Sequence, residues 1–129
     1  MIVVDSSVWI DYFCGKDTLQ TDQLDQILGA QSVAIGDIIL TEVLQGFRSD
    51  KEYTIAKSLL GEFVILDMLG KHMALKSAHT YRKLRKKGVT VRKTIDVIIA
   101  TYCIEHRLPL LFSDKDFKPL VTHMGLIAF

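Results

Sequence analysis

Short apolar runs alternate with longer amphipathic segments along the whole chain. The apolar runs predict strands at residues 2–4, 33–36, 63–66, 108–112 and 126–129. Between these runs, apolar side chains recur every three or four residues, and this spacing predicts helices at residues 6–15, 18–29, 38–47, 51–61, 71–87, 94–107 and 114–121. The long helix at 71–87 is expected to bury the face that carries Met73, Ala74, Ala78, Tyr81 and Leu84.

The alternation of strands and helices indicates the α/β class. The predicted strands are continuously apolar, which is typical of a parallel sheet covered by helices on both faces. No repeat, low-complexity tract or linker divides the chain, so we expect one domain over residues 1–129 with a central, mainly parallel sheet. In folds of this kind, ligands bind at the carboxyl ends of the strands.

Charge is distributed unevenly along the chain, although the net charge is only +1. The overall composition, 49% hydrophobic and 24% charged, is that of an ordinary globular protein. Residues 1–70 carry eleven acids and four Lys or Arg, whereas residues 71–95 carry nine Lys or Arg and no acid. A basic patch is therefore expected to lie apart from the acidic positions.

Neither a membrane segment nor a leader is predicted. The apolar segments are far shorter than the roughly 20 residues that span a bilayer, and residues 1–4 lack the features of a signal peptide. Cys14 and Cys103 have no C-x-x-C spacing and are expected as reduced thiols. These features predict a cytoplasmic protein that makes no contact with membranes.

Four carboxylates are predicted to meet at one edge of the sheet. Asp5 ends the first strand, and Asp114 follows the strand at 108–112. Glu42 lies on the helix entered directly after the second strand, and Asp96 lies in the first turn of the helix at 94–107. The carboxyl ends of parallel strands share one edge, so the four side chains are expected to converge there.

Each acid also has a purely structural interpretation. Asp5 and the segment Ser113–Asp116 fit helix caps, and Asp96 after a Thr94 cap favours the helix dipole. A dipole interaction contributes only about 0.3–1 kcal/mol. Two carboxylates about 4 Å apart repel by roughly 4 kcal/mol at an effective dielectric of about 20. A cluster of acids therefore needs a cation, and all-oxygen ligation suits Mg²⁺ or Mn²⁺.

Four segments together resemble the PIN-domain ribonucleases, specifically the VapC-like toxins of toxin–antitoxin pairs. They are VVDSSVWIDYF (3–13), EVLQG (42–46), GVTVRKTIDVIIATYC (88–103) and LLFSDKDF (110–117). The resemblance covers essentially the whole chain. It implies a three-layer α/β/α sandwich.

The resemblance also implies roles for single residues. The acidic quartet is Asp5, Glu42, Asp96 and Asp114, and Asp116 is an auxiliary acid. Asp5 and Asp96 are expected as the main direct metal ligands, with Glu42 and Asp114 at a second ion or bridging waters. Ser6 and Ser113 match hydroxyl positions that orient carboxylates or water, although the family often has Thr or Asn where Ser113 stands.

The function implied is that of a metal-dependent endoribonuclease toxin. Mg²⁺ or Mn²⁺ held by the carboxylates would activate water and neutralise charge on the RNA phosphate. The expected partners are the RNA substrate, a cognate antitoxin and a second copy in a homodimer. Trp9, Tyr12 and Phe13 are expected either to pack in the core or to receive a hydrophobic segment of the antitoxin.

The basic segment at 81–93 is the candidate path for RNA. Seven cations without a neutralising acid lead directly into Asp96, and phosphate contacts to such cations are independent of sequence and sensitive to salt. The alternative is a solvated helix end. The candidate RNA-binding residues are Arg82, Arg85, Lys86, Lys87, Arg92 and Lys93.

Two other functions remain open at this point. A receiver-like phosphoacceptor domain has a parallel sheet and an acidic Mg²⁺ pocket, but it needs an adjacent acidic pair after the first strand, and here Asp5 stands alone. Asp67 follows the third strand as an acceptor would, yet a suitable lysine after a later strand is missing. A catalytically silent relative that binds RNA or antitoxin is the second alternative, against which the complete quartet argues.

Overall fold

All four strands of the central sheet run parallel. The computed structural model describes residues 1–129 and pairs the strands in the order β3-β2-β1-β4. The strands are β1 (Ile2–Val4), β2 (Val33–Gly36), β3 (Val64–Leu66) and β4 (Leu110–Leu111). The predicted α/β class with a parallel central sheet is confirmed. The receiver-like alternative does not fit, because that fold places the third strand beside the first, whereas β2 separates them here.

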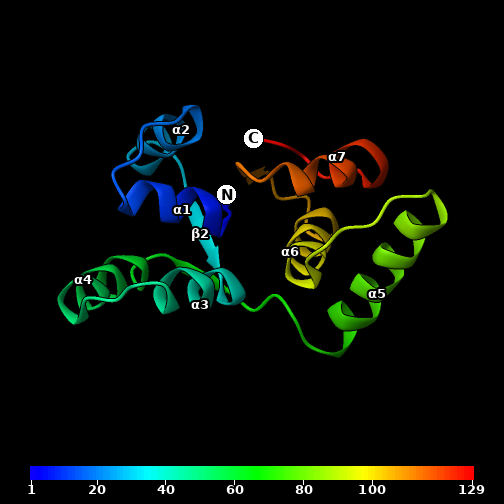
Figure 1. Ribbon diagram of the computed structural model, residues 1–129, viewed down its shortest axis with the longest axis horizontal. Coiled ribbons are helices and arrows are strands. Elements are labelled where there is room, and N and C mark those ends of the chain that lie inside the picture. The colour runs from blue at the N-terminus through cyan, green and yellow to red at the C-terminus, as the bar shows by residue number, and fades with distance from the viewer.

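Helices flank the sheet on both sides (Figure 1). The first group is α1 (Ser6–Phe13), α2 (Leu19–Leu28), α3 (Asp37–Gln45) and α4 (Asp50–Leu60). The second group is α5 (Lys71–Lys86), α6 (Thr94–Glu105), the 3-10 turn η1 (Lys115–Phe117) and α7 (Lys118–Met124). Contacts link α1 with α2 and α3 in the first group, and α5 with α6 and α7 in the second. This is the layering of an α/β/α sandwich.

Helix α6 lies at the centre of the fold. Eight consecutive residues, Asp96 to Cys103, are buried, and the helix packs against α5 and η1. Strands β1, β2 and β4 are buried along their whole length. The edge strand β3 leaves Val64 and Ile65 exposed. A charged residue on the inner part of α6, such as Asp96, therefore sits at the margin of the core.

Three sequence predictions are corrected here. The strand expected at 126–129 is only an isolated parallel bridge between Leu110 and Ala128, and β4 spans two residues instead of 108–112. On α5, Ala74 and Ala78 are exposed, and the buried stripe is Met73, Ser77, Thr80 and Leu84. Hydroxyl side chains tolerate this burial when the helix backbone satisfies them, as the Lys76 carbonyl does for Thr80 (3.1 Å).

None of the helices combines the length and the apolar character that crossing a bilayer requires.

Candidate metal centre

The acidic residues gather where the strand order reverses. From β1 the chain continues to β2 on one side, and β4 later adds on the other side of β1. Asp5 follows β1 directly, and its backbone N–H donates to the Leu111 carbonyl at 2.9 Å. Asp114 follows β4 by three residues. A switch point of this kind is where parallel α/β sheets bind ligands.

Asp5 is a helix cap with one free oxygen. Its Oδ2 accepts hydrogen bonds from the Ser7 backbone N–H (3.2 Å) and from Ser7 Oγ (2.6 Å). These contacts cap the N-terminus of α1. Its Oδ1 is buried and has no hydrogen-bond partner, and the residue is only 3% exposed. Burial raises the pKa of Asp5, and the hydrogen bonds from Ser7 oppose that rise.

Asp96 has the same kind of unused oxygen. The residue is 5% exposed, and its Oδ2 is buried without a partner. Burial, together with the charges of Asp5 and Asp114, raises the pKa of Asp96 to about 7. A buried polar atom without a hydrogen bond costs free energy. Two such oxygens, on Asp5 and Asp96, therefore fit a cation that the chain itself does not supply.

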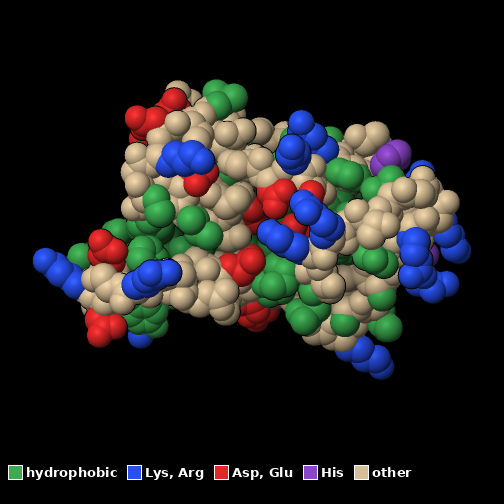
Figure 2. Space-filling view, viewed as in Figure 1, with side chains coloured by type: hydrophobic (Ala, Val, Ile, Leu, Met, Phe, Trp, Pro, Cys, Tyr) green, Lys and Arg blue, Asp and Glu red, His purple; other side chains and the backbone are tan.

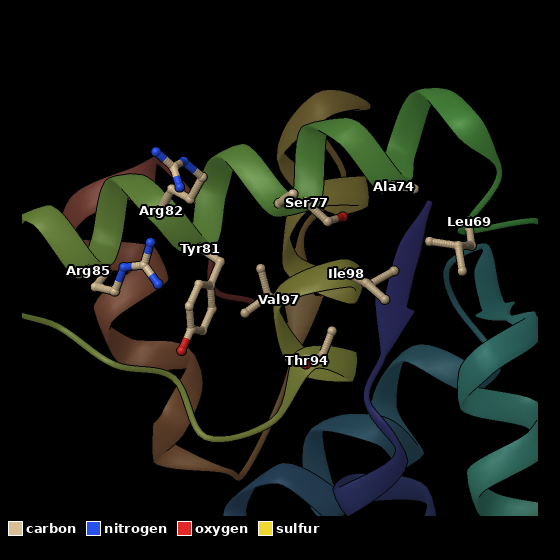
Figure 3. A pocket seen from close by; sticks show the side chains of 10 residues that line it. Leu69, Ala74, Ser77, Tyr81, Arg82, Arg85, Thr94, Val97 and Ile98 are labelled. Carbon is tan, nitrogen blue, oxygen red and sulfur yellow. The ribbon is translucent and has the colours of Figure 1, made fainter.

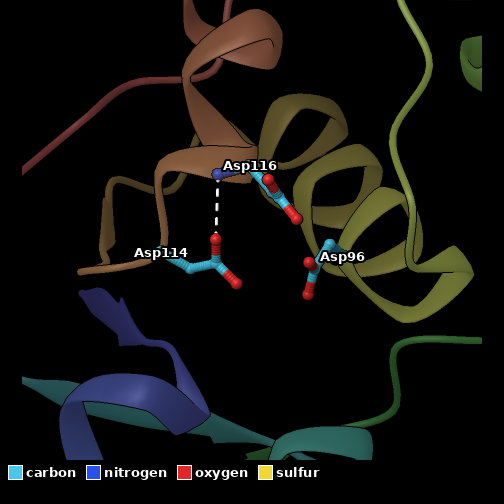
Figure 4. Close-up of side chains that lie close together, drawn as sticks. All are labelled: Asp96, Asp114 and Asp116. Carbon is cyan, nitrogen blue, oxygen red and sulfur yellow. Dashed lines mark hydrogen bonds between the residues drawn. The ribbon is translucent and has the colours of Figure 1, made fainter.

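The tightest group of acids is Asp96, Asp114 and Asp116. Each offers one carboxylate oxygen, and the three oxygens lie within 4.8 Å of one another (Figure 4). Asp114 caps η1 by accepting from the Asp116 backbone N–H at 2.9 Å, so this turn points both side chains toward Asp96. Asp116, expected only as an auxiliary acid, belongs to this group, whereas Asp5 and Glu42 do not.

Glu42 lies beside the group on α3. Its Oε1 accepts from Ser6 Oγ at 3.1 Å, and the side chain is half-buried. Burial raises the pKa of Glu42, with a further contribution from the charge of Asp5. Glu42 in turn contributes to the raised pKa of Asp96. Glu42 therefore lies close enough to Asp5 and Asp96 for their charges to interact at the same edge of the sheet as Asp114.

Hydroxyl groups connect the acids in a way that the sequence only partly predicts. Ser6 contacts Glu42, but the Ser113 side chain makes no hydrogen bond, and its backbone N–H lies 3.5 Å from Ser7 Oγ. Sequence reasoning missed Ser7, which bridges Asp5 and the Ser113 backbone. Its position in the first turn after a capping aspartate was the available signal.

The capping interpretation proves correct for two acids and wrong for a third residue. Asp5 and Asp114 do cap helical segments, each with one oxygen. Thr94 is not a cap, because α6 begins after Lys93 and has no side-chain cap hydrogen bond. Capping accounts for one oxygen of Asp5 and leaves the other free, so it does not compete with a role in metal binding.

The predicted RNA-binding cations separate into three sets. Lys93 Nζ lies 3.7 Å from Asp114 Oδ2, and Arg92 Nη2 lies 3.6 Å from Asp116 Oδ2. Figure 2 shows such basic side chains against acidic ones at the centre of one face. Elsewhere, Arg82 and Arg85 line a groove between α5 and α6 (Figure 3).

The remaining cations and the early aromatic residues occupy other surfaces. Lys86 and Lys87 are exposed at the C-terminal end of α5. Trp9 is buried in the core, as one of its two interpretations expected. Tyr12 and Phe13 are only partly buried, and Phe13 lines a second pocket formed by α1, α3 and the start of α4.

The donor set favours a hard divalent cation. All ligand atoms at this edge are carboxylate oxygens, and no His or Cys belongs to the group. Such donors suit Mg²⁺ or Mn²⁺ better than zinc.

Residues 2–120 match the family described as PIN domain. Across its full length the chain is 28% identical to Ribonuclease VapC11 of Mycobacterium tuberculosis and to VapC ribonuclease Mb1587 of Mycobacterium bovis. These alignments span 133 residues and cover 100% of this chain and 99% of each relative.

Solved structures share the fold. VapBC2 from Rickettsia felis, bound to a DNA fragment from the promoter, has a TM-score of 0.78 at 17% identity and covers 100% of this chain and 98% of its own. A toxin–antitoxin complex from Klebsiella pneumoniae has a TM-score of 0.74 at 22% identity, with 99% and 97% covered.

Proposed function

The chain belongs to the PIN domain family, and we propose that it is an endoribonuclease that depends on Mg²⁺ or Mn²⁺ to hydrolyse RNA phosphodiester bonds. One observation carries this proposal. Two buried carboxylate oxygens, on Asp5 and Asp96, have no partner and lie at the same edge as a three-carboxylate group. The similarity to proteins named VapC ribonuclease supports RNA as the substrate.

Most of the carboxylates would serve as metal ligands. Asp96, Asp114 and Asp116 would hold the cation, with the free oxygen of Asp5 as a further ligand. When bound, a divalent cation supplies an activated water and neutralises charge on the phosphate. The capping contacts fix Asp5 and Asp114 before any ligand arrives, so little reorganisation is needed.

Glu42 is the proposed general base. Ser6 holds its Oε1, so its Oε2 is available to accept a proton from the attacking water. The raised pKa of Glu42, caused mainly by burial, makes it a better proton acceptor than an exposed carboxylate. Lys93 and Arg92, beside the acids, would bind the phosphates that flank the cleaved bond.

We propose a cognate antitoxin as the regulatory partner. The related structures from Rickettsia felis and Klebsiella pneumoniae are toxin–antitoxin assemblies. The pocket between α1 and α3, which includes Ile10, Phe13, Val43 and Phe47, offers an apolar surface for such a partner. We also propose that the chain forms a homodimer, for which the exposed apolar side chains of Ile65 on β3 and Leu75 on α5 are candidate contacts.

Cleavage of RNA by the purified protein tests the proposal. Mg²⁺ should generate new RNA ends that a chelator abolishes, and sequencing those ends identifies the cut site. Asp96→Asn keeps the shape of the side chain but removes its charge. We expect cleavage to fall about a hundredfold or more, since even changes around metal ligands cost about 10- to 100-fold.

The matched control is Asp17→Asn, the same change at an exposed aspartate outside the site. It should cleave like the wild type. If Asp96→Asn also cleaves like the wild type while remaining folded, the assigned site is wrong. A folded wild type that binds RNA but never cleaves it with either metal would favour the silent relative.

A further inference from the structure

Two basic side chains extend over the mouth of the acidic group. Lys93 and Arg92 are 62% and 82% exposed, whereas their partners Asp114 and Asp116 are 27% and 21% exposed. The cations therefore lie on the solvent side of the carboxylates. Lys93 has the wider influence, because its charge also lowers the pKa values of Asp96 and Glu42 against the upward effect of burial.

These ion pairs have the properties of exchangeable contacts. The separations of 3.6 and 3.7 Å exceed the ~3.2 Å limit of good N–H···O hydrogen bonds. Exposed pairs of this kind contribute little to stability. The backbone at Lys93 is fixed, since its carbonyl accepts from the Asp96 N–H at 3.2 Å. Only the flexible side chains need to move for the pairs to break.

We propose that Lys93 and Arg92 are exchangeable counter-ions that couple metal binding to RNA binding. Without metal they neutralise Asp114 and Asp116. When a divalent cation occupies the carboxylates, the ammonium and guanidinium groups are released and bind the phosphates of the incoming RNA. This inference rests on the proposed function and adds to it a mechanism by which the metal-free protein holds RNA weakly.

Metal binding and RNA binding are coupled because the basic side chains and the metal compete for the same carboxylates. A cation paired with Asp114 competes with the metal for the same oxygen, and its charge repels the metal. The same cation, once released, adds an attractive contact to RNA that the metal-free protein cannot make. Because coupling between two ligands is reciprocal, RNA should also tighten metal binding.

Metal affinity without RNA is the first measurement. Calorimetric titration of Lys93→Ala with Mg²⁺ should give a dissociation constant about two- to fivefold lower than that of the wild type, the size expected of an exposed ion pair. Lys51→Ala removes the same charge from exposed α4 and should bind Mg²⁺ like the wild type. Lys93→Arg keeps the charge and should stay close to wild type.

RNA affinity with and without metal is the second measurement. Fluorescence anisotropy of a labelled single-stranded RNA gives the ratio of its dissociation constants in chelator and in Ca²⁺, which replaces Mg²⁺ so that the RNA stays intact. This ratio should shrink about two- to fivefold in Lys93→Ala relative to Lys51→Ala. Lys93→Arg should restore it.

The outcomes separate this inference from the proposed function. If Lys93→Ala binds Mg²⁺ no more tightly than Lys51→Ala, or keeps the full ratio of RNA affinities, Lys93 is not an exchangeable counter-ion, even in a protein that cleaves RNA. If the folded wild type binds neither Mg²⁺ nor Mn²⁺, both the proposed function and this inference are overturned.

Discussion

Asp96 is almost completely buried, and one of its carboxylate oxygens has no hydrogen-bond partner. It lies in the first turn of α6, where a carboxylate normally favours the helix dipole, yet its side chain points to Asp114 and Asp116 instead of solvent (Figure 4). Burial, with the charges of Asp5 and Asp114, holds its pKa near 7. In the metal-free protein, Asp96 therefore carries a proton for part of the time at neutral pH.

This pKa predicts how the metal-free protein responds to pH. Asp96 has an ordinary pKa of 3.8 when unfolded and about 7 when folded. Between about pH 4 and 7 the native state keeps a proton that the unfolded chain has lost, so stability falls as pH rises through this window. The free energy of unfolding, measured with denaturant in the presence of a chelator, should fall by up to about 3 kcal/mol between pH 5 and 8, at 1.36 kcal/mol per pKa unit.

Asp96→Asn should remove most of this dependence, since asparagine does not titrate. Asp17→Asn, at an exposed position, should retain the wild-type dependence. A wild type whose unfolding free energy is the same at pH 5 and pH 8, or rises with pH, would contradict the assigned environment of Asp96.

At the scale of elements, the basic segment from α5 to α6 does not act as one unit. The turn before α6 brings Arg92 and Lys93 onto the acids, whereas Lys86 and Lys87 remain at the C-terminal end of α5 without an ion pair. The latter two also favour the negative end of the helix dipole. Their lack of acidic partners leaves them available for phosphate.

Lys86→Ala combined with Lys87→Ala tests this end of α5. In a cleavage-deficient Asp96→Asn background, we expect RNA affinity to fall for all sequences. The slope of log affinity against log salt should flatten by up to about 1.4, because each lost phosphate contact on a single strand contributes about 0.7. The measurement is RNA affinity over a salt series.

The control for this experiment is Lys51→Ala combined with Lys57→Ala. It removes the same charge from exposed positions on α4. Equal losses in both double variants would indicate a general charge effect, and unchanged affinity in the α5 variant would indicate a solvated helix end.

At the scale of the whole molecule, the acidic edge lowers the stability of the metal-free fold. Carboxylates that follow β1, lie on α3 and α6 and flank η1 converge there, and burial together with the neighbouring charges raises the pKa values of Asp5, Glu42 and Asp96. A cation that binds only the native state would relieve this repulsion and stabilise every element that contributes a ligand.

Mg²⁺ or Mn²⁺ should therefore raise the melting temperature. At 100 times the dissociation constant, the gain is about 2.7 kcal/mol. Asp5→Asn should reduce this rise, because it removes the charge of a buried carboxylate that we propose as a further metal ligand. Asparagine is also a good helix cap, so the metal-free variant should be at least as stable as the wild type. Differential scanning fluorimetry with and without millimolar metal measures both effects. A wild-type melting temperature that neither Mg²⁺ nor Mn²⁺ changes would contradict a metal site at this edge.

The sequence by itself determined the order of the elements and the edge at which the acids lie. Apolar runs and helical spacing are local properties, so they located β1, β2 and β3 closely and gave the parallel α/β class. Asp5 and Asp114 were placed correctly because a residue that follows a parallel strand must lie at the carboxyl edge. Short pairings are harder, and the strand expected at 126–129 proved to be a single bridge.

Only the tertiary structure decided which side chains meet. The η1 turn brings Asp116 into the group with Asp96 and Asp114, Ser7 joins β1 to the segment after β4, and Lys93 folds back onto Asp114. These distances depend on how η1 and α6 pack beside the sheet, not on the spacing of residues in the chain. Lys93 precedes α6 and Asp114 follows β4, and the two meet because the first turn of α6 lies beside the acids at the carboxyl edge of the sheet, a contact that no local pattern encodes.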